Sequence, residues 1–396
     1  MPQPDQQPAT LCVHAGRRPQ AGDSAVVTPI YQTSTFLPSE ADYELVKEGR
    51  GFESRVYSRY GNPSVVVPEL RIAALEGAEE ARLFSSGNAA MHAVVMSTAL
   101  PAGHVLAASK LYGGTRAQLD SCLQAAGGSV TYVDFDDRDL LRDAFQSNTR
   151  LLICESLANP TLEVADIPFL GELAHANNAL LAVDATFATP IHQRPLELGA
   201  DLVIHSASKY IGGHSDLIAG AVAGPGKLMS RVTSWRTNAG GCLDPHAAFL
   251  IDRGLKTLAL RMAAHCSGAS ALAEFLESHE AVECVRHPSL ESFPQKARAA
   301  ELLSGMGGML FFTLKGSDED AAHLLSNLRL AVPAASLGGV ETLVNQPALT
   351  SHAGMSESER TFAGIPPGSV RVSVGIEGPE DLIADFDQAL SSLPQR

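Results

Sequence analysis

Short apolar segments alternate with helix-like segments through the middle of the chain. Five runs of mostly apolar residues end in polar ones, at 104–109, 130–135, 150–156, 180–187 and 201–206. Between two of them, residues 167–178 have the spacing of apolar positions that is typical of a helix. Because strands with near-continuous apolar sequence are buried on both faces, this alternation predicts an α/β fold with a mainly parallel central sheet.

The pattern changes toward both ends of the chain. Residues 1–60 lack a long amphipathic period and predict an N-terminal arm, and helical spacing begins near Glu69. After about residue 245 comes one long helical stretch with a kink expected at Gly254 or Gly268, then strand-like segments and a closing helix at 379–393. We therefore expect three parts: an arm (1–60), a ligand-binding domain (61–245) and a C-terminal domain (246–396).

Composition limits the partners that fit this chain. Its 396 residues include 29 Lys and Arg against 44 Asp and Glu, a formal net charge of −15, which argues against nucleic acid or an anionic membrane as partner. No apolar run is long enough for a membrane helix, and the N-terminus lacks the features of a secretory signal. The six cysteines are scattered without a C-x-x-C pair, which predicts reduced thiols and a cytoplasmic location.

The stretch 203–216, VIHSASKYIGGHSD, carries the first candidate chemistry. Lys209 stands among serines and glycines directly after an apolar strand, and Asp184 ends the preceding strand. One strand–helix–strand step separates them, so both side chains can face one crevice at the carboxyl ends of the strands. The alternatives are an exposed loop lysine and a capping aspartate. His205 and His214 lack further ligands at suitable spacing, so we expect no metal site.

Three further stretches could bind anions. Residues 83–94 form a Ser/Gly turn that opens a helix, and free N–H groups at a helix start attract a phosphate, although an ordinary serine cap explains the stretch as well. Tyr57 and Arg59 in YSRYGNPS could clamp a phosphate or lie in a solvated loop. Arg371, in a strand-like apolar segment, is either a structural ion-pair partner or a fork for a carboxylate.

Taken together, these groups suit one cofactor. A lysine for a Schiff base, an aspartate for a pyridinium nitrogen and a phosphate site at a helix start are what pyridoxal phosphate (PLP) requires. With these residues and with LYGGT, ESLANPTLEVADI, VDATFATP, RGLKTLALRM and ASLGGVETL, the chain resembles the PLP-dependent enzymes of cysteine and methionine metabolism from about residue 10 to 392. The resemblance implies the type I PLP-dependent aminotransferase-like fold, with a smaller C-terminal α/β domain. It also implies a homotetramer of two tight dimers, with each active site shared across a dimer.

The resemblance also implies a role for each site residue. Lys209 would bind PLP and Asp184 would hold its ring nitrogen protonated, while Tyr112 would stack on the ring and assist the leaving group. Arg371 and Ser336 would hold the substrate carboxylate. The remaining contacts would be Gly87, Asn88, Ser206 and Ser208 at the phosphate, Asn159 at the ring hydroxyl, and Tyr57 and Arg59 from a neighbouring subunit, with Tyr57 also touching the substrate.

Three positions bear on the choice of reaction. Gly114 stands where methionine γ-lyases usually have cysteine, and Val56 stands where cystathionine enzymes usually have an acidic residue. Glu341 favours a γ-lyase or γ-synthase over a sulfhydrylase. We predict a γ-eliminating C–S lyase acting on cystathionine or methionine-like amino acids. The alternatives are γ-substitution, of the cystathionine γ-synthase or O-acyl-homoserine sulfhydrylase type, and a catalytically silent PLP-fold binding protein.

Overall fold

Two β-sheets organise the part of the chain that the computed structural model describes, which is residues 6–16, 25–51, 54–350, 353, 356–362 and 364–394. The larger sheet has seven strands, and its spatial order is β1 (Glu80–Phe84), β7 (Gly220–Gly224), β6 (Leu202–His205), β5 (Leu180–Asp184), β4 (Thr149–Glu155), β2 (His104–Ala108) and β3 (Ser129–Val133). The five strands from β6 to β3 are parallel, whereas β7 runs antiparallel to both of its neighbours, β6 and the edge strand β1. All five strands predicted from the apolar runs are therefore confirmed.

The near-continuous apolar sequence of the central strands has a direct structural cause. In β4, Leu151 and Ile153 pack into a hydrophobic cluster on one face of the sheet, and Leu152 and Cys154 pack into a cluster on the other face. Because both faces are buried over Leu151–Cys154, each of these positions gains from an apolar side chain, by about 1.5–3 kcal/mol for a large one.

Helices cover both faces of the seven-stranded sheet. Residues of α4 (Gly87–Ala99) and α9 (Gly226–Ala239) belong to the first cluster, and residues of α7 (Ile167–Ala176) belong to the second. The other helices of this part of the chain are α3 (Pro63–Glu76), α5 (Gly113–Gln118), α6 (Arg138–Asp143) and α8 (Thr189–His192), with shorter turns at η2 (Leu119–Leu123) and η3 (Pro195–Leu198).

Local signals fix where some of these helices begin and end. The helix that the sequence suggested from Glu69 starts earlier, because Asn62 caps the backbone N–H of Ser64 and Pro63 occupies the first turn. It ends at Gly77, which has a φ of 67°. The arm contains two short helices that the sequence did not predict, α1 (Pro8–His14) and α2 (Glu40–Lys47).

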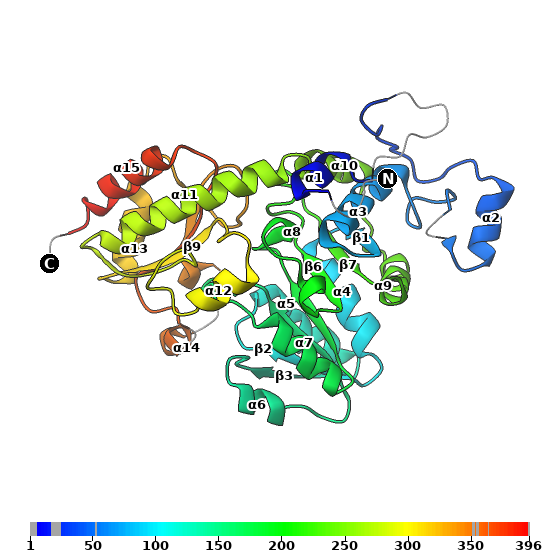
Figure 1. Ribbon diagram of the computed structural model, residues 1–396, viewed down its shortest axis with the longest axis horizontal. Coiled ribbons are helices and arrows are strands. Elements are labelled where there is room, and N and C mark those ends of the chain that lie inside the picture. Colours follow the sequence, from blue (N-terminus) through cyan, green and yellow to red (C-terminus); the bar gives the residue numbers. More distant parts are fainter. Residues whose placement is uncertain are drawn as a thin grey trace.

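The smaller sheet has five strands in the C-terminal part of the chain. Their order is β10 (Val332–Pro333), β11 (Leu343–Asn345), β12 (Ser369–Ser373), β9 (Met309–Leu314) and β8 (Val282–Arg286). The accompanying helices are α10 (Pro245–Leu255), α11 (Leu258–Ser278), α12 (Lys296–Leu302), α13 (Asp318–Asn327), η4 (Pro347–Leu349), α14 (Glu357–Phe362) and α15 (Pro379–Leu390). Figure 1 shows α11 running from beside α1 and α10 to the far side of this sheet.

The long helical stretch after residue 245 is two helices rather than one kinked helix. The break lies at Lys256 and Thr257, between α10 and α11, so the expected kink at Gly254 or Gly268 is a helix boundary two residues after Gly254. Gly254 has a different role, because a Cβ at this position would lie 2.4 Å from the carbonyl oxygen of Gly212. Its hydrogen therefore lets α10 pack directly on the loop that follows Lys209.

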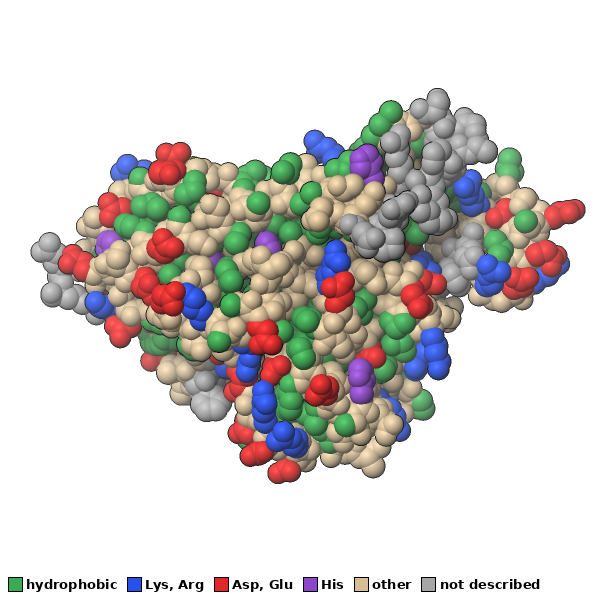
Figure 2. Space-filling model, in the orientation of Figure 1, with side chains coloured by type: hydrophobic (Ala, Val, Ile, Leu, Met, Phe, Trp, Pro, Cys, Tyr) green, Lys and Arg blue, Asp and Glu red, His purple; other side chains and the backbone are tan. Residues whose placement is uncertain are grey.

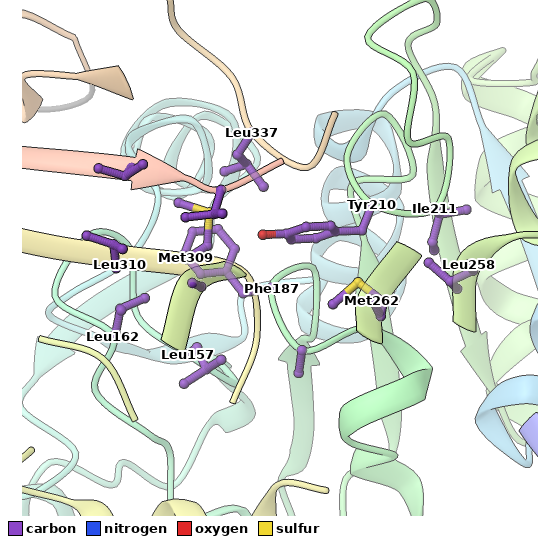
Figure 3. Close-up of a cluster of buried hydrophobic side chains, with 14 of the residues drawn as sticks. Leu157, Leu162, Phe187, Tyr210, Ile211, Leu258, Met262, Met309, Leu310 and Leu337 are labelled. Carbon is purple, nitrogen blue, oxygen red and sulfur yellow. The ribbon is translucent and has the colours of Figure 1, made fainter. Parts of the chain in front are cut away.

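One hydrophobic core joins the two sheets. Tyr210, which directly follows Lys209 and is fully buried, points toward Met309 of β9, with Phe187 and Leu337 beside them (Figure 3). Burial of these side chains holds the lysine loop against the smaller sheet. The division of the chain at residues 60 and 245 stays a prediction.

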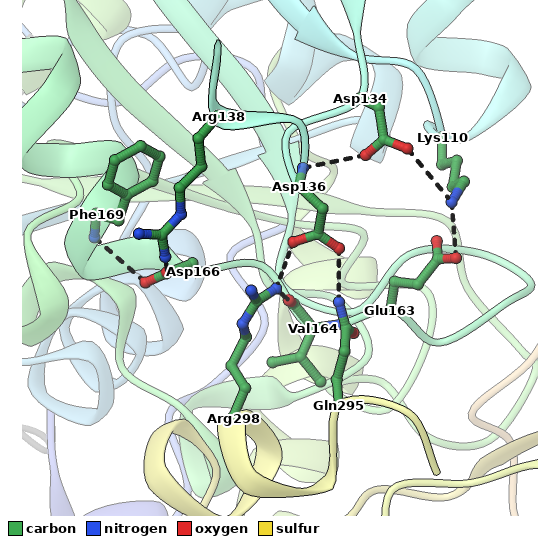
Figure 4. Close-up of polar contacts among 10 residues, drawn as sticks. All are labelled: Lys110, Asp134, Asp136, Arg138, Glu163, Val164, Asp166, Phe169, Gln295 and Arg298. Carbon is green, nitrogen blue, oxygen red and sulfur yellow. Dashed lines mark hydrogen bonds and ion pairs between the residues drawn. The ribbon is translucent and has the colours of Figure 1, made fainter. Parts of the chain in front are cut away.

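Polar contacts cross between the same two parts at another point. Gln295 donates to Asp136 and accepts from the N–H of Val164, at 2.7 and 2.6 Å, and Arg298 donates to Asp136 and to the carbonyl of Val164 (Figure 4). These contacts join the segment at the start of α12 to the loops that follow β3 and β4. The two sheets are therefore connected by both apolar and polar contacts.

The surface carries charges of both signs. Figure 2 shows acidic and basic side chains interspersed on the face in view. No described helix is long and apolar enough to cross a membrane. Over the same residues there is no group of three or more His, Cys, Asp or Glu placed to hold a metal ion.

Candidate active site

Lys209 lies in the loop that follows β6, at the carboxyl end of the sheet. Its Nζ donates a 2.8 Å hydrogen bond to Oγ of Ser336, which belongs to the C-terminal part of the chain. Burial, with a smaller effect from the charge of Arg371, lowers the pKa of Lys209 from its ordinary value. A lysine with a lowered pKa can act as a nucleophile or base near neutral pH.

Ser336 connects Lys209 to Arg371. Its φ of 89° is uncommon for a residue with a side chain, and such backbone strain concentrates at functional sites. This conformation directs the hydroxyl to Lys209 and the carbonyl to Arg371, whose Nη2 donates to it at 2.9 Å. Arg371 also donates from Nη1 to Asn159 Oδ1 at 3.0 Å.

Arg371 has capacity left for an anion. Its side chain is buried, and its Nε has no partner among the described residues. Burial lowers the pKa of Arg371 to about 10, so the guanidinium is still protonated at neutral pH. A buried N–H donor without a partner is costly, and a substrate carboxylate beside it would satisfy it.

Asp184 ends β5, next to the strand that leads to Lys209. Its Oδ1 accepts hydrogen bonds from the N–H and the hydroxyl of Thr186, at 3.0 and 2.5 Å, while no described residue donates to Oδ2. Burial raises the pKa of Asp184, against the lowering effect of Thr186 and of the charge of His205. Such a carboxylate is suited to a cationic N–H partner, which would return its pKa to the usual range.

The expected phosphate site lies where α4 begins. Ser86 caps this helix by accepting from the N–H of Ala89, and Gly87 packs so closely that a Cβ there would lie 3.0 Å from the Cβ of Ser206. Asn88 follows in the first turn, where free N–H groups favour an anion. The structure therefore brings Gly87, Asn88 and Ser206 together.

Ser208, the fourth residue expected at the phosphate, is held by Ala219, the residue before β7. Its hydroxyl accepts from the N–H of Ala219 at 2.9 Å and donates to the carbonyl of the same residue at 3.2 Å. The bond from the Ala219 N–H orients the Ser208 hydroxyl. The hydroxyl has one proton, which it could donate to a phosphate instead of to the Ala219 carbonyl.

Tyr112 and Asn159 lie on either side of Glu155, the last residue of β4. The backbone N–H of Tyr112 donates to Glu155 Oε1 at 2.6 Å, and the N–H of Asn159 donates to Oε2 at 2.9 Å. The Tyr112 side chain is 48% exposed, so its ring is accessible to a ligand. Glu155 pairs in register with Asp184 on the neighbouring strand, which links both residues to the Asp184 region.

Tyr57 and Arg59 are not brought to the lysine within one chain. Tyr57 is exposed and pairs with Thr35 of the arm, and Arg59 donates to the carbonyl of Thr237 and lies over the Tyr60 ring. None of these contacts involves the residues around Lys209.

The three positions expected to determine substrate choice, Gly114, Val56 and Glu341, lie in different surroundings. A Cβ at Gly114 would lie 2.4 Å from the ring of Tyr112 and 3.1 Å from the Asn88 side chain, so this position borders the candidate site. Val56 lies on the arm, where its carbonyl accepts from Phe36 and from the hydroxyl of Thr35. Glu341 lies in the loop between β10 and β11, after Ser336.

Sequence reasoning missed two residues that hold the site together. Thr186 accepts from the N–H of Ser206 and donates to Asp184, so it joins the two halves of the crevice. Arg261 of α11 donates to the carbonyls of Tyr210 and Gly254 and fixes the lysine loop. Thr186 could have been predicted, because a hydroxyl two residues after an aspartate is typical of a turn in which the two side chains bond. The partners of Arg261 could not, because they depend on tertiary packing.

The residues around Lys209 offer suitable partners for three functional groups of PLP. The cofactor ring nitrogen would meet the Oδ2 of Asp184, its aldehyde would meet Lys209, and its phosphate would meet the start of α4. A side chain larger than hydrogen at Gly87 would fill the space beside Ser206. Donor and acceptor types therefore match the cofactor in all three places.

Comparison with known proteins supports the same assignment. A sequence model of the Cys/Met metabolism PLP-dependent enzymes matches residues 9–391. The chain is 42% identical to an L-methionine γ-lyase from Treponema denticola over 93% of each sequence. It is also 38% identical to cystathionine γ-synthase 1, chloroplastic, from Nicotiana tabacum, over 97% of this chain and 72% of that protein.

A solved structure shows the same fold. The crystal structure of metB from Corynebacterium glutamicum superposes with a TM-score of 0.92 at 38% identity, covering 98% of this chain and 99% of that one. The α/β fold and the PLP cofactor predicted from the sequence are confirmed by these matches. The chain belongs to the Cys/Met metabolism PLP-dependent enzyme family.

Proposed function

We propose that the protein is a PLP-dependent carbon–sulfur lyase that carries out γ-elimination on cystathionine or methionine-like amino acids. The products are a 2-oxo acid, ammonia and a thiol, and one water is consumed. The observation that supports the proposal is the chain of contacts from Lys209 through Ser336 to Arg371. It joins an amine suited to proton transfer to a guanidinium suited to a substrate carboxylate. The relatives named methionine γ-lyase support the same reaction type.

Each residue then has a definite task. The bound cofactor supplies an electron sink that acidifies the substrate protons. Arg371 binds the substrate carboxylate and so orients the Cα–H bond toward Lys209. The amine of Lys209, with its lowered pKa, would accept the Cα proton, release it again and, once neutral, accept a β proton. Asp184 holds a proton on the ring nitrogen, and Tyr112 assists the departing sulfur.

The experiment starts from purified, PLP-loaded protein. The bound cofactor should give a visible absorption band at about 420 nm that is absent in Lys209→Ala, because this band depends on the covalent link. The wild type is incubated with methionine, with cystathionine, and with O-acetyl- or O-succinyl-homoserine plus cysteine. We expect 2-oxobutyrate from the first two substrates.

The other outcomes are equally informative. New cystathionine without 2-oxobutyrate would show γ-substitution, the reaction that the relative named cystathionine γ-synthase suggests. A wild type that lacks the visible band would overturn the enzyme hypothesis and leave a silent binding protein. Gly114, Val56 and Glu341 are the positions we propose to govern substrate choice.

We also propose a cytoplasmic homotetramer built from two tight dimers. All six cysteines are unpaired, which suits a reducing compartment. Tyr57 and Arg59, which do not reach Lys209 within one chain, would then enter the active site of a neighbouring copy. There Arg59 would hold the phosphate and Tyr57 would lie near both phosphate and substrate.

A further inference from the structure

Two carboxylates stand side by side at the carboxyl end of the larger sheet. Glu155 of β4 and Asp184 of β5 are partners in the strand register, so their side chains leave the sheet on the same face. Asp184 has the expected role at the cofactor ring nitrogen. Glu155 has no role in the reaction as described so far, although it lies within the same group of residues.

The hydrogen bonds of Glu155 form a fork. One oxygen accepts from the N–H of Tyr112 and the other accepts from the N–H of Asn159, at 2.6 and 2.9 Å. Tyr112 would stack on the ring and Asn159 would meet its hydroxyl, and Asn159 also accepts from Arg371. A single carboxylate therefore fixes the backbone at two proposed ring contacts and, through the second, supports the carboxylate-binding arginine.

We propose that Glu155 is a positioning residue, which holds Tyr112 and Asn159 against the cofactor ring and whose charge acts on Asp184. This inference rests on the proposed placement of the cofactor. A glutamate side chain offers two oxygens to two N–H donors in either protonation state, because its OH oxygen still has a lone pair, whereas an amide would turn an NH2 group that cannot accept toward one of them. A glutamate at this position therefore serves the fork in a way that glutamine cannot.

The electrostatic part of the role follows from the neighbours of Glu155. Burial and the charge of Asp184 raise the pKa of Glu155 to about 8, against the lowering effect of the two N–H donors. Glu155 also borders a cavity of about 50 Å³, large enough for water, through which its proton can exchange. The other charged groups around this cavity are Lys110, Asp134, Asp136, Glu163 and Asp166.

The consequence for the cofactor has a definite sign. Below about pH 8 Glu155 is protonated and neutral, and above it the carboxylate adds a second negative charge beside Asp184. That charge favours the protonated ring nitrogen. The absorption of the bound cofactor should therefore change in a step near pH 8 that belongs to Glu155.

The test compares PLP-loaded wild type with Glu155→Gln, Glu155→Asp and the control Glu163→Gln. Glu163 is a neighbouring carboxylate that pairs with Lys110 and contacts neither Tyr112 nor Asn159. The readouts are the visible circular dichroism of the bound cofactor, its absorbance from pH 6 to 10, and kcat and KM measured separately. Circular dichroism reports how the cofactor is held, independently of turnover.

We expect Glu155→Gln to weaken the dichroism band and to abolish the step near pH 8. Its kcat should fall about 10- to 100-fold, as expected for a misplaced reacting group, with KM changed by less than about threefold. Glu155→Asp keeps the charge and shortens the fork, so it should weaken the dichroism band and retain the pH step. Glu163→Gln should behave as wild type.

Several results would contradict the proposal. One is a Glu155→Gln variant that equals wild type in dichroism, pH response and kcat, and another is an equal loss in Glu163→Gln. If Glu155→Gln fails to fold, the test rests on Glu155→Asp. A wild-type dichroism band in that variant would show that the two hydrogen bonds to Glu155 do not position the cofactor contacts. A wild type without lyase activity that still shows these cofactor signals would overturn the proposed function and leave the inference standing.

Discussion

The ring of Tyr112 occupies the space that a side chain at position 114 would need. Only 2.4 Å would separate a Cβ at Gly114 from a ring carbon of Tyr112, which real structures do not tolerate without movement. The glycine therefore permits the present ring position. The second glycine of LYGGT therefore allows the ring position on which the proposed role of Tyr112 depends.

Gly114→Ala should consequently turn the Tyr112 ring and impair catalysis. We expect kcat to fall about tenfold or more, since small misplacements of a reacting group are costly, while the cofactor stays bound. Steady-state kinetics and the visible absorption band measure the two effects. Gly51→Ala is the control, because there the nearest atom to the new methyl group is a Tyr60 ring carbon at 3.5 Å. Equal kinetics for both variants would contradict the prediction.

Residues joined by chain neighbours could be predicted from the sequence, and residues joined by packing could not. Lys209 and Asp184 follow adjacent strands, so the spacing along the chain already placed them in one crevice. The contact between Lys209 and Ser336 spans 127 positions and was not predicted; family resemblance placed Ser336 in the site only as a partner of the substrate carboxylate. Arg261 lies on a helix face and gave no signal, because its carbonyl partners are defined by the fold.

At the scale of elements, the apolar pattern predicts best where burial is two-sided. Strands β2, β4, β5 and β6 were recognisable because most positions along them are buried, whereas β3 at the sheet edge is mostly half-buried. Strands β1 and β7 were not predicted, since GAVAG in β7 consists of small residues without a strand-like pattern. The boundary between α10 and α11 was missed for a similar reason, because no proline or cap marks Thr257.

One strand end makes stability sensitive to pH. His287 follows β8, is fully buried, and contacts Ser289, and burial lowers its pKa to about 4. Above pH 6.5 the imidazole is neutral in both the folded and unfolded chain. As the pH falls from about 6.5 toward 4, only the unfolded chain takes up the proton, so the free energy of unfolding decreases.

His287→Gln removes this proton uptake. The thermal midpoint of the wild type should fall between pH 7 and pH 5, and the fall should be smaller in the variant, whatever its midpoint at pH 7. Differential scanning calorimetry at several pH values measures both slopes. His323→Gln removes an exposed imidazole and should keep the wild-type slope. A variant slope equal to that of wild type would disprove the assignment to His287.

At the scale of the whole molecule, part of the arm projects from the rest of the chain and exposes apolar side chains. Leu37 is fully exposed, Val26 is 77% exposed, and α2 has no buried residue. Figure 1 places α2 at the edge of the molecule opposite α15. Exposed apolar residues on a projecting segment are typical of a contact with another copy of the chain.

Leu37→Asp should therefore weaken assembly. Sedimentation velocity of the wild type should give four times the mass of one chain, and the variant should shift toward smaller species as the concentration is lowered. Activity should fall together with the mass, because Tyr57 and Arg59 would no longer reach a neighbouring site. The exposed Leu140→Asp on α6 is the control and should leave the mass unchanged. A monomeric wild type would refute the predicted assembly.

Ser336, with its positive φ, fixes the separation between Lys209 and Arg371. Its hydroxyl accepts from Lys209, in the loop after β6 of the larger sheet, and its carbonyl accepts from Arg371 of β12 in the smaller sheet. One residue therefore links the two sheets at the candidate site. An amino acid bound as we propose would contact Arg371 through its carboxylate and lie with its Cα near Lys209, so both contacts would be independent of its sulfur end. In that arrangement, discrimination between amino acids of different side-chain length would fall to the residues at the sulfur end, for which we propose Gly114, Val56 and Glu341.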